Sequence, residues 1–290
     1  MDVNLGLNTR KSLDLEPGMH FEDLKDRAHL NEAILRNISD GEITGGIVDA
    51  RLFEEKEVSH SNIDEGFLSN SEDLVINGDI VGKYALSYSN NIEINGSVAT
   101  DKFGLYSSHI EINGNLLSSQ VSVEEDLSVR GNIFTDELLR GAKNSIVEAG
   151  EITADTILVG YEDRKPENSA IRADSINASD LLWDAQNSYI LTDKLVATGQ
   201  IGGYDTSGSV VAARDIEFDE KPKSGVTVFT ELENDNFTTY NGDWESLERI
   251  IDKYIDQAGF ESGLFMLEGS YSSSNHLEDE IEQNMRINKA

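Results

Sequence analysis

The sequence predicts an all-β protein built around a single-stranded parallel β-helix, and three observations predict it. Similar segments return about every 18 residues, apolar and polar residues alternate inside them, and no helix-length segment separates them. A strand–helix–strand crossover needs about a dozen or more connecting residues, so these repeats are too short for an α/β fold. Short strands joined by tight corners match the turns of a β-helix.

The clearest repeat is an Asn-Gly motif that follows an apolar-x-apolar strand. LVINGD begins at residue 74, IEINGS at 92 and IEINGN at 110, with LSVRGN at 127 as a looser copy. The repeat should stack Ile76, Ile94, Ile112 and Val129 inside, with Asn77, Asn95 and Asn113 and then Gly78, Gly96, Gly114 and Gly131 at a corner. Stacked amides can bond one another, and glycine suits a corner that needs positive φ. Arg130 replaces the fourth asparagine, so the amide ladder should end before it.

A second pattern, a pair of apolar residues five apart, extends the repeat to about ten coils over residues 41–220. The pairs are Ile47/Leu52, Ile63/Leu68, Ile80/Ala85, Val98/Phe103, Leu116/Val121, Ile133/Leu138, Ile152/Ile157, Ile171/Ile176, Ile190/Leu195 and Val211/Ile216. We expect each pair to occupy the same place in its coil, which gives a rod of roughly 50 Å. Open coil ends invite end-to-end association, so Ile47, Leu52, Val211 and Ile216 are candidate end contacts.

The segments on either side of the repeats should cover or extend the rod. Residues 1–40 are expected to form an N-terminal arm with a helix over residues 21–36. Residues 221–290 are expected to form a helical cap and an acidic tail, with a helix over residues 243–258 that Asp243 caps and Gly259 ends. That helix would cap the last coil or dock a protein partner.

Composition and motifs exclude several kinds of site. The chain has no cysteine, which excludes disulfides, cysteine metal ligands and thiol nucleophiles. Its 55 acidic and 23 basic residues give a net charge of −32, which opposes binding to nucleic acid. The five histidines are scattered, and His109 at a coil corner is the one candidate general base. We expect no enzyme activity, no cofactor and no metal.

Two further pairs of residues lie 18 apart and should stack. Glu93 above Glu111 would bring like charges together, unless high salt or a cation relieves the repulsion. Tyr88 above Tyr106 would add to the coil interface or form an exposed platform for a ligand. The acidity itself fits general solubility or adaptation to high salt.

The I-x-I-x-G motif near every 18 residues, with short non-repetitive arms, resembles the bactofilins and the archaeal halofilin-type proteins over residues 41–220. The resemblance implies a right-handed β-helix that polymerises end to end, binds no nucleotide and acts in cell shape or protein positioning. The chain departs from that pattern in having more coils and an ordered-looking helix at 243–258. A helix over the last coil would block polymerisation through that end.

Three functions stay open on the sequence. The first is a polymer-forming cytoskeletal scaffold, the second is a β-helical structural subunit of a larger complex, and the third is a β-helical carbohydrate-active enzyme or acyltransferase. The N-terminus has no apolar stretch of signal-peptide length, and no window approaches the ~20 apolar residues of a membrane span. We expect a cytoplasmic protein, or one held at a membrane by a partner.

Overall fold

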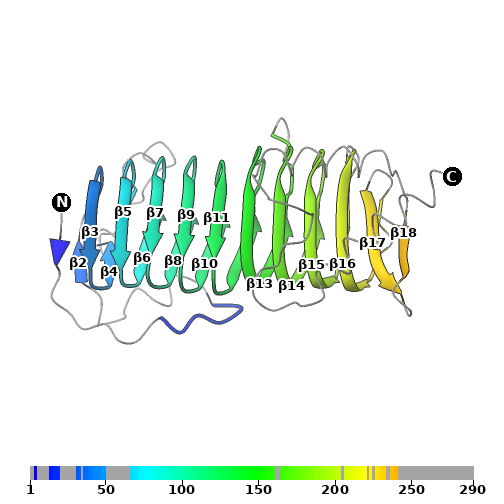
Figure 1. The fold of residues 1–290 in the computed structure, drawn as a ribbon, viewed down its shortest axis with the longest axis horizontal. Coiled ribbons are helices and arrows are strands. Elements are labelled where there is room, and N and C mark those ends of the chain that lie inside the picture. Colours follow the sequence, from blue (N-terminus) through cyan, green and yellow to red (C-terminus); the bar gives the residue numbers. More distant parts are fainter. Residues whose placement is uncertain are drawn as a thin grey trace.

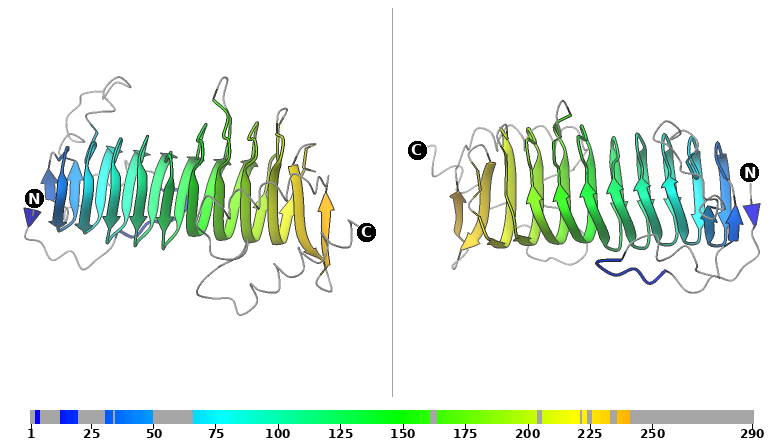
Figure 2. Two further views of the ribbon diagram at one scale, coloured as in Figure 1. Left: turned by 45° about the horizontal axis from the view of Figure 1, so that its top comes forward. Right: turned by 180° about the vertical axis from the view of Figure 1, so that it is seen from behind.

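The chain folds as an all-β parallel β-solenoid, a rod around whose long axis the strands wind (Figures 1 and 2). The computed structural model describes residues 3–4, 13–19, 31–33, 35–49, 66–160, 164–203, 206–220, 222–223, 226–232 and 236–240. These residues contain no helix, and therefore none long and apolar enough to span a membrane. The predicted fold class is confirmed.

The strands are short in the first half of the rod and long in the second. In chain order they are β1 (Val3–Asn4), β2 (Asn31–Ala33), β3 (Ser39–Thr44), β4 (Ile47–Asp49), β5 (Glu72–Asn77), β6 (Ile80–Ala85), β7 (Asn90–Ile94), β8 (Val98–Phe103), β9 (Ser108–Ile112), β10 (Leu116–Val121), β11 (Asp126–Val129), β12 (Ile133–Leu138), β13 (Ile146–Ile157), β14 (Ala170–Leu181), β15 (Tyr189–Ala197), β16 (Ser209–Phe218), β17 (Val226–Leu232) and β18 (Asn236–Tyr240).

Two parallel ladders run along the rod. The first ladder joins β1, β3, β5, β7, β9, β11, β13, β14, β15, β16 and β17, and the second joins β2, β4, β6, β8, β10, β12 and the later parts of β13 to β16. Eight strands of the first ladder, from β5 to β16, enclose seven full turns, fewer than the ten coils expected from the sequence. Partial turns follow at each end, and β18 pairs antiparallel with β17.

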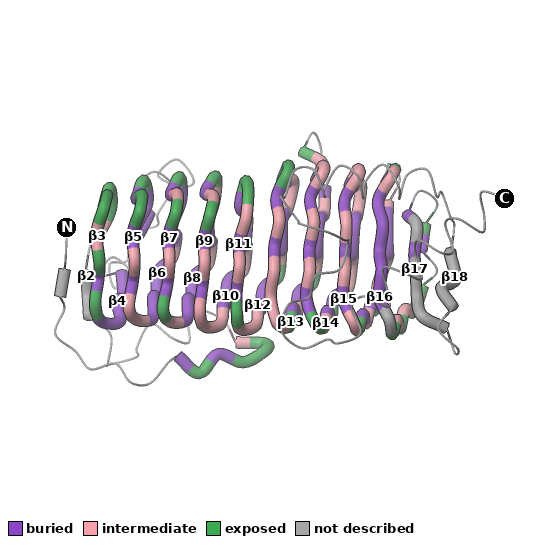
Figure 3. The backbone as a smooth tube through the Cα atoms, viewed as in Figure 1, coloured by how far each residue is buried: buried purple, intermediate pink, exposed green. Residues whose placement is uncertain are grey.

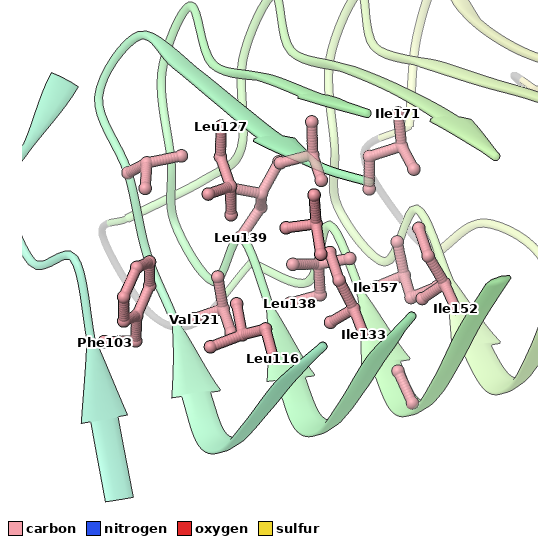
Figure 4. Packing of buried hydrophobic residues seen from close by; sticks show 14 of the residues in the cluster. Phe103, Leu116, Val121, Leu127, Ile133, Leu138, Leu139, Ile152, Ile157 and Ile171 are labelled. Atoms are coloured by element: carbon pink, nitrogen blue, oxygen red, sulfur yellow. The ribbon is translucent and has the colours of Figure 1, made fainter. Parts of the chain in front are cut away.

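The core is one apolar column inside the rod (Figures 3 and 4). As predicted, Ile76, Ile94, Ile112 and Val129 pair in register and are at most 2% exposed. Each such side chain contributes about 1.5–3 kcal/mol when fully buried. Because each turn supplies the same positions, the column continues through the whole stack.

The predicted register of the five-apart pairs is right in the first half of the rod. Ile80, Val98, Leu116, Ile133 and Ile152 pair in that order along the second ladder. The coil predicted to begin at Ile63 does not lie between its neighbours, because Ile47 pairs directly with Ile80.

The register is wrong in the second half. Ile152 pairs with Ile176, whereas Ile171 pairs with Val147 on the first ladder. Ile190 pairs with Ile171, so it also lies on the first ladder and not on the second, where it was predicted. The physical reason is that the corner between the two ladders shortens from three residues, 130–132, to two, 150–151, inside β13.

The flanking predictions have mixed outcomes. Residues 31–33 of the predicted helix 21–36 are instead strand β2, because they pair in register with β4. The parallel ladders extend past both predicted boundaries, 41 and 220, since β3 begins at Ser39 and β17 pairs with β16. The predicted helix 243–258 and the acidic tail lie outside the described residues.

The N-terminal strap, residues 13–19, packs on the outside of the solenoid. Its Leu13 and Leu15 are 2% and 5% exposed. They cover an outward apolar stripe on the second ladder, formed by Val48, Val81, Ala99, Leu117 and Phe134, with Met19 packed beside it. The Leu13 N–H donates to Asp79 Oδ2 at 2.8 Å, which fixes the strap to a corner. This strap was not predicted from the sequence.

Candidate functional site

The Asn-Gly corner contains the predicted amide ladder. Asn95 Nδ2 donates to Asn77 Oδ1 at 2.9 Å, and Asn113 Nδ2 donates to Asn95 Oδ1 at 2.6 Å. The ladder begins at Asn77, whose amide donates to Glu42 Oε1 at 2.6 Å. It ends where predicted, because Arg130 instead pairs with Glu111 at 2.9 Å.

The corner glycines are required for a different reason from the predicted one. Gly78, Gly96 and Gly114 do not have positive φ, so that part of the prediction was wrong. A Cβ on Gly96 would lie 2.3 Å from the carbonyl oxygen of Gly78, and one on Gly114 would lie 2.5 Å from that of Gly96. A Cβ on Gly131 would likewise lie 2.6 Å from the Gly114 oxygen. Glycine is needed because successive backbones approach too closely for any side chain.

The residues after the glycines form a second row of hydrogen bonds along this corner, from side chain to backbone. This row was not predicted from the sequence. Asp79 Oδ1 accepts the N–H of Ser97 at 2.7 Å, and Ser97 Oγ accepts the N–H of Asn115 at 3.1 Å. Asn115 Oδ1 then accepts the N–H of Asn132 at 2.9 Å. The signal was present, since Asp, Ser and Asn are the side chains that most readily bond nearby backbone N–H groups.

The stacked glutamates are partly neutralised by these corners. Glu93 and Glu111 pair in register, as predicted. Glu93 Oε1 accepts from Asn95 Nδ2 at 3.0 Å, and Glu111 binds the Arg130 guanidinium. The repulsion that like charges cause between neighbouring strands is therefore reduced within the protein.

Two of the candidate end contacts lie inside the stack. Ile47 is fully buried between Asn31 of β2 and Ile80 of β6. Val211 is fully buried between β15 and β17. Ile216 is at the end of the described second ladder, because β17 pairs with only Ser209–Ala213 of β16. Leu52 lies outside the described residues.

His109 lies between two carboxylates on an exposed corner. Its Nε2 is 2.8 Å from Glu125 Oε2, and its Nδ1 contacts Asp126 Oδ1. Each ring nitrogen of a histidine can bond a carboxylate oxygen when it carries a proton. The three side chains are each about half exposed, and their ligand atoms lie within 4.8 Å of one another. The cluster thus ties two neighbouring turns together across the corner.

No family model, curated protein or solved structure matches the chain.

Proposed function

We propose that this chain is a non-catalytic structural scaffold, a cytoskeletal polymer-forming protein of the bactofilin or halofilin type that associates end to end. The observation that supports it is that the second ladder, within the described residues, ends in an edge with no further strand at each end of the rod. Among the described residues, no strand covers the outer edge of β2 at one end. At the other end, within the same part of the chain, residues 215–217 of β16 pair only with β15.

A second copy placed further along the rod axis would continue the second ladder, with its β2 beside the later part of β16. Such pairing would supply hydrogen-bond partners to the backbone N–H and C=O groups along both edges. The two edges differ, so the contact is heterologous and produces an open filament rather than a closed dimer. Strand β18 pairs with β17, so the first ladder is covered at that end and the second ladder carries the contact.

The proposal includes a role for the filament in the cell. A rigid rod that extends by addition at its ends can determine cell shape or position other proteins. We place it in the cytoplasm, with a protein partner docked through residues 243–258 and any attachment to a membrane made through that partner.

Sedimentation velocity and negative-stain microscopy test the proposal at low and molar salt. We expect species that lengthen with protein concentration. Ile216→Lys places a charge at the proposed contact and should leave a monomer, whereas Asn177→Lys, exposed in the middle of the rod, makes the same change of charge and should still polymerise. A single monomeric species of the wild-type protein at every concentration and salt contradicts the proposal.

A further inference from the structure

One corner of the solenoid repeatedly requires left-handed backbone. The residues at this position have φ between 46° and 67° and are each followed by a buried serine; they are Asn70, Tyr88, Tyr106, Asn144, Asn168, Asn187 and Gly208. Asparagine and glycine tolerate left-handed φ, whereas a bulky side chain there is an outlier that destabilises the backbone. The two tyrosines therefore stand where the rest of the chain uses residues better suited to the corner.

Burial of the side chains does not offset the unfavourable backbone conformation of the two tyrosines. Tyr88 and Tyr106 are 44% and 37% exposed, and they are the only exposed large hydrophobic side chains in the described part of the chain. Their rings stack with centroids 5.0 Å apart and an interplanar angle of 23°. Bulky residues also have left-handed φ at other corners, but they are buried; these are Leu68, Leu86, Leu139, Leu158 and Leu182. Exposure of the rings therefore distinguishes the two tyrosines, and exposed tyrosines are enriched at binding surfaces.

A groove of about 1070 Å³ opens beside Tyr106, and unequal corner lengths explain it. Six residues connect Phe103 to Ile110, but only five connect Val121 to Leu127 in the next turn. The following corner is longer again, with eight residues between Leu138 and Val147. The short corner thus forms a floor between two higher walls.

The two walls of the groove differ in chemistry. Tyr106 and Lys102 belong to the turn on one side, and Arg140, Lys143 and Arg164 belong to the turns on the other. Glu137 holds the Arg140 guanidinium at 2.9 Å, and Glu167 lies 3.4 Å from Lys143 Nζ, so partners outside the groove orient both cations.

The charge balance of the lining is the reverse of that of the chain. The chain has 23 basic and 55 acidic residues. The groove is lined by four basic residues and two acidic ones, the latter being Glu124 and Glu125 on the floor. With Glu137 and Glu167, which pair with Arg140 and Lys143, the groove and its rim hold four basic and four acidic residues. That balance is far less acidic than that of the chain, and it favours an anionic ligand here over one elsewhere on the surface.

We propose that the groove binds an acidic oligosaccharide of the uronate type. A sugar ring stacks its C–H face on Tyr106, and its carboxylates bond to the guanidinium and ammonium groups of the opposite wall. Gln120, Ser122 and Asn144 also line the groove, and they supply donors and acceptors for hydroxyl groups. An open, polar groove suits a chain-like ligand better than a small apolar one.

Calorimetric titration with an oligogalacturonate at low ionic strength tests the proposal. Tyr106→Asn is the decisive variant, because asparagine already occupies the same corner at Asn144, Asn168 and Asn187. We expect this variant to keep the wild-type unfolding midpoint and to bind about tenfold more weakly or worse. Arg164→Gln should weaken binding of the acidic oligomer and make its affinity less sensitive to salt.

The controls separate ring stacking, charge and fold. An uncharged cello-oligosaccharide of the same length should bind more weakly than the oligogalacturonate. Tyr88→Asn should have a smaller effect than Tyr106→Asn, since Tyr88 does not line the groove. Undetectable binding of the oligogalacturonate, equal binding of the uncharged oligomer, or unchanged binding by Tyr106→Asn would each overturn the proposal. Filament formation is scored on the same samples, so failure of the scaffold function remains distinguishable.

Discussion

The first half of the solenoid, β5 to β12, and the second half, β13 to β16, have the same apolar interior but different corners. Between β7 and β8 in the first half, three residues, 95–97, separate the two ladders, and the strands break there. Two residues, 150–151, separate them in the second half, and β13 runs unbroken through the corner. A visible motif arises only where the backbones of successive corners approach so closely that glycine is required.

The shorter corner also changes the apolar spacing. In the first half, Leu74 and Ile80 lie six residues apart across the corner. In the second half, Val147 and Ile152 lie five apart, which equals the spacing of Ile152 and Ile157 within one ladder. Two different structural spacings thus become identical in sequence, and this explains why the predicted register moved to the wrong ladder after Ile152.

The largest expected difference between the halves is at the corner glycines. Gly96→Ala puts a Cβ 2.3 Å from the Gly78 carbonyl oxygen, and backbone atoms cannot easily move, so we expect a loss of about 3 kcal/mol. Gly150→Ala meets its nearest atom, the Gly131 oxygen, at 3.1 Å, and we expect a loss below about 1 kcal/mol. Urea unfolding of both variants measures this, and equal losses would contradict the steric account.

The N-terminal strap provides a second difference between the two halves, because the apolar stripe that it covers ends at Phe134. On the second ladder Phe134 is followed by Thr153 and Asn177, which are polar. Leu15→Ala should therefore destabilise the first half alone, by about 2 kcal/mol, since it removes a buried side chain. Hydrogen exchange should become faster in β6, β8 and β10 and stay unchanged in β14 and β15.

The control for the strap is the exposed neighbour of Leu15. Asp14→Ala should change the unfolding free energy by no more than about 0.5 kcal/mol. Faster exchange throughout the rod in Leu15→Ala would show that the strap stabilises more than the stripe beneath it.

Much of the fold could be predicted from the sequence, because a solenoid repeats its chemistry. The inward stack from Ile76 to Val129 and the amide ladder could be read directly from the spacing of 18. The glycine role could not, since a close backbone approach and a positive φ select the same residue. The strap was missed because its Leu13-x-Leu15 alternation has no repeat to mark it.

The candidate groove was the least predictable feature. The stacking of Tyr88 on Tyr106 followed from their spacing. The groove beside them depends on a corner that is one residue shorter than its neighbour, and on Arg140 and Arg164 in other turns. Such a juxtaposition depends on how unequal corners stack, and no single repeat contains that information.

A smaller effect should follow loss of the amide ladder. Asn95→Ala removes the bonds to Asn77 and Asn113 from an exposed corner, and we expect a loss of about 1 kcal/mol. Asp174→Ala, exposed in a two-residue corner of the second half, should change stability by less than about 0.5 kcal/mol. Chemical denaturation of both variants makes the comparison, and a larger effect for Asp174→Ala would contradict it.

The smallest expected effect is an alkaline loss of stability in the first half. Burial, and then the nearby Asp101 carboxylate, raise the pKa of Tyr84 above its ordinary value of 10.0. The folded protein therefore holds this proton more tightly than the unfolded chain does. Its stabilising contribution is complete below about pH 10 and is lost as the pH rises from there through the higher folded-state pKa. Tyr84→Phe has no proton to lose, so its stability should fall less steeply above about pH 10. Parallel unfolding curves of the two proteins across that range would show that Tyr84 ionises as easily in the folded solenoid as in the unfolded chain.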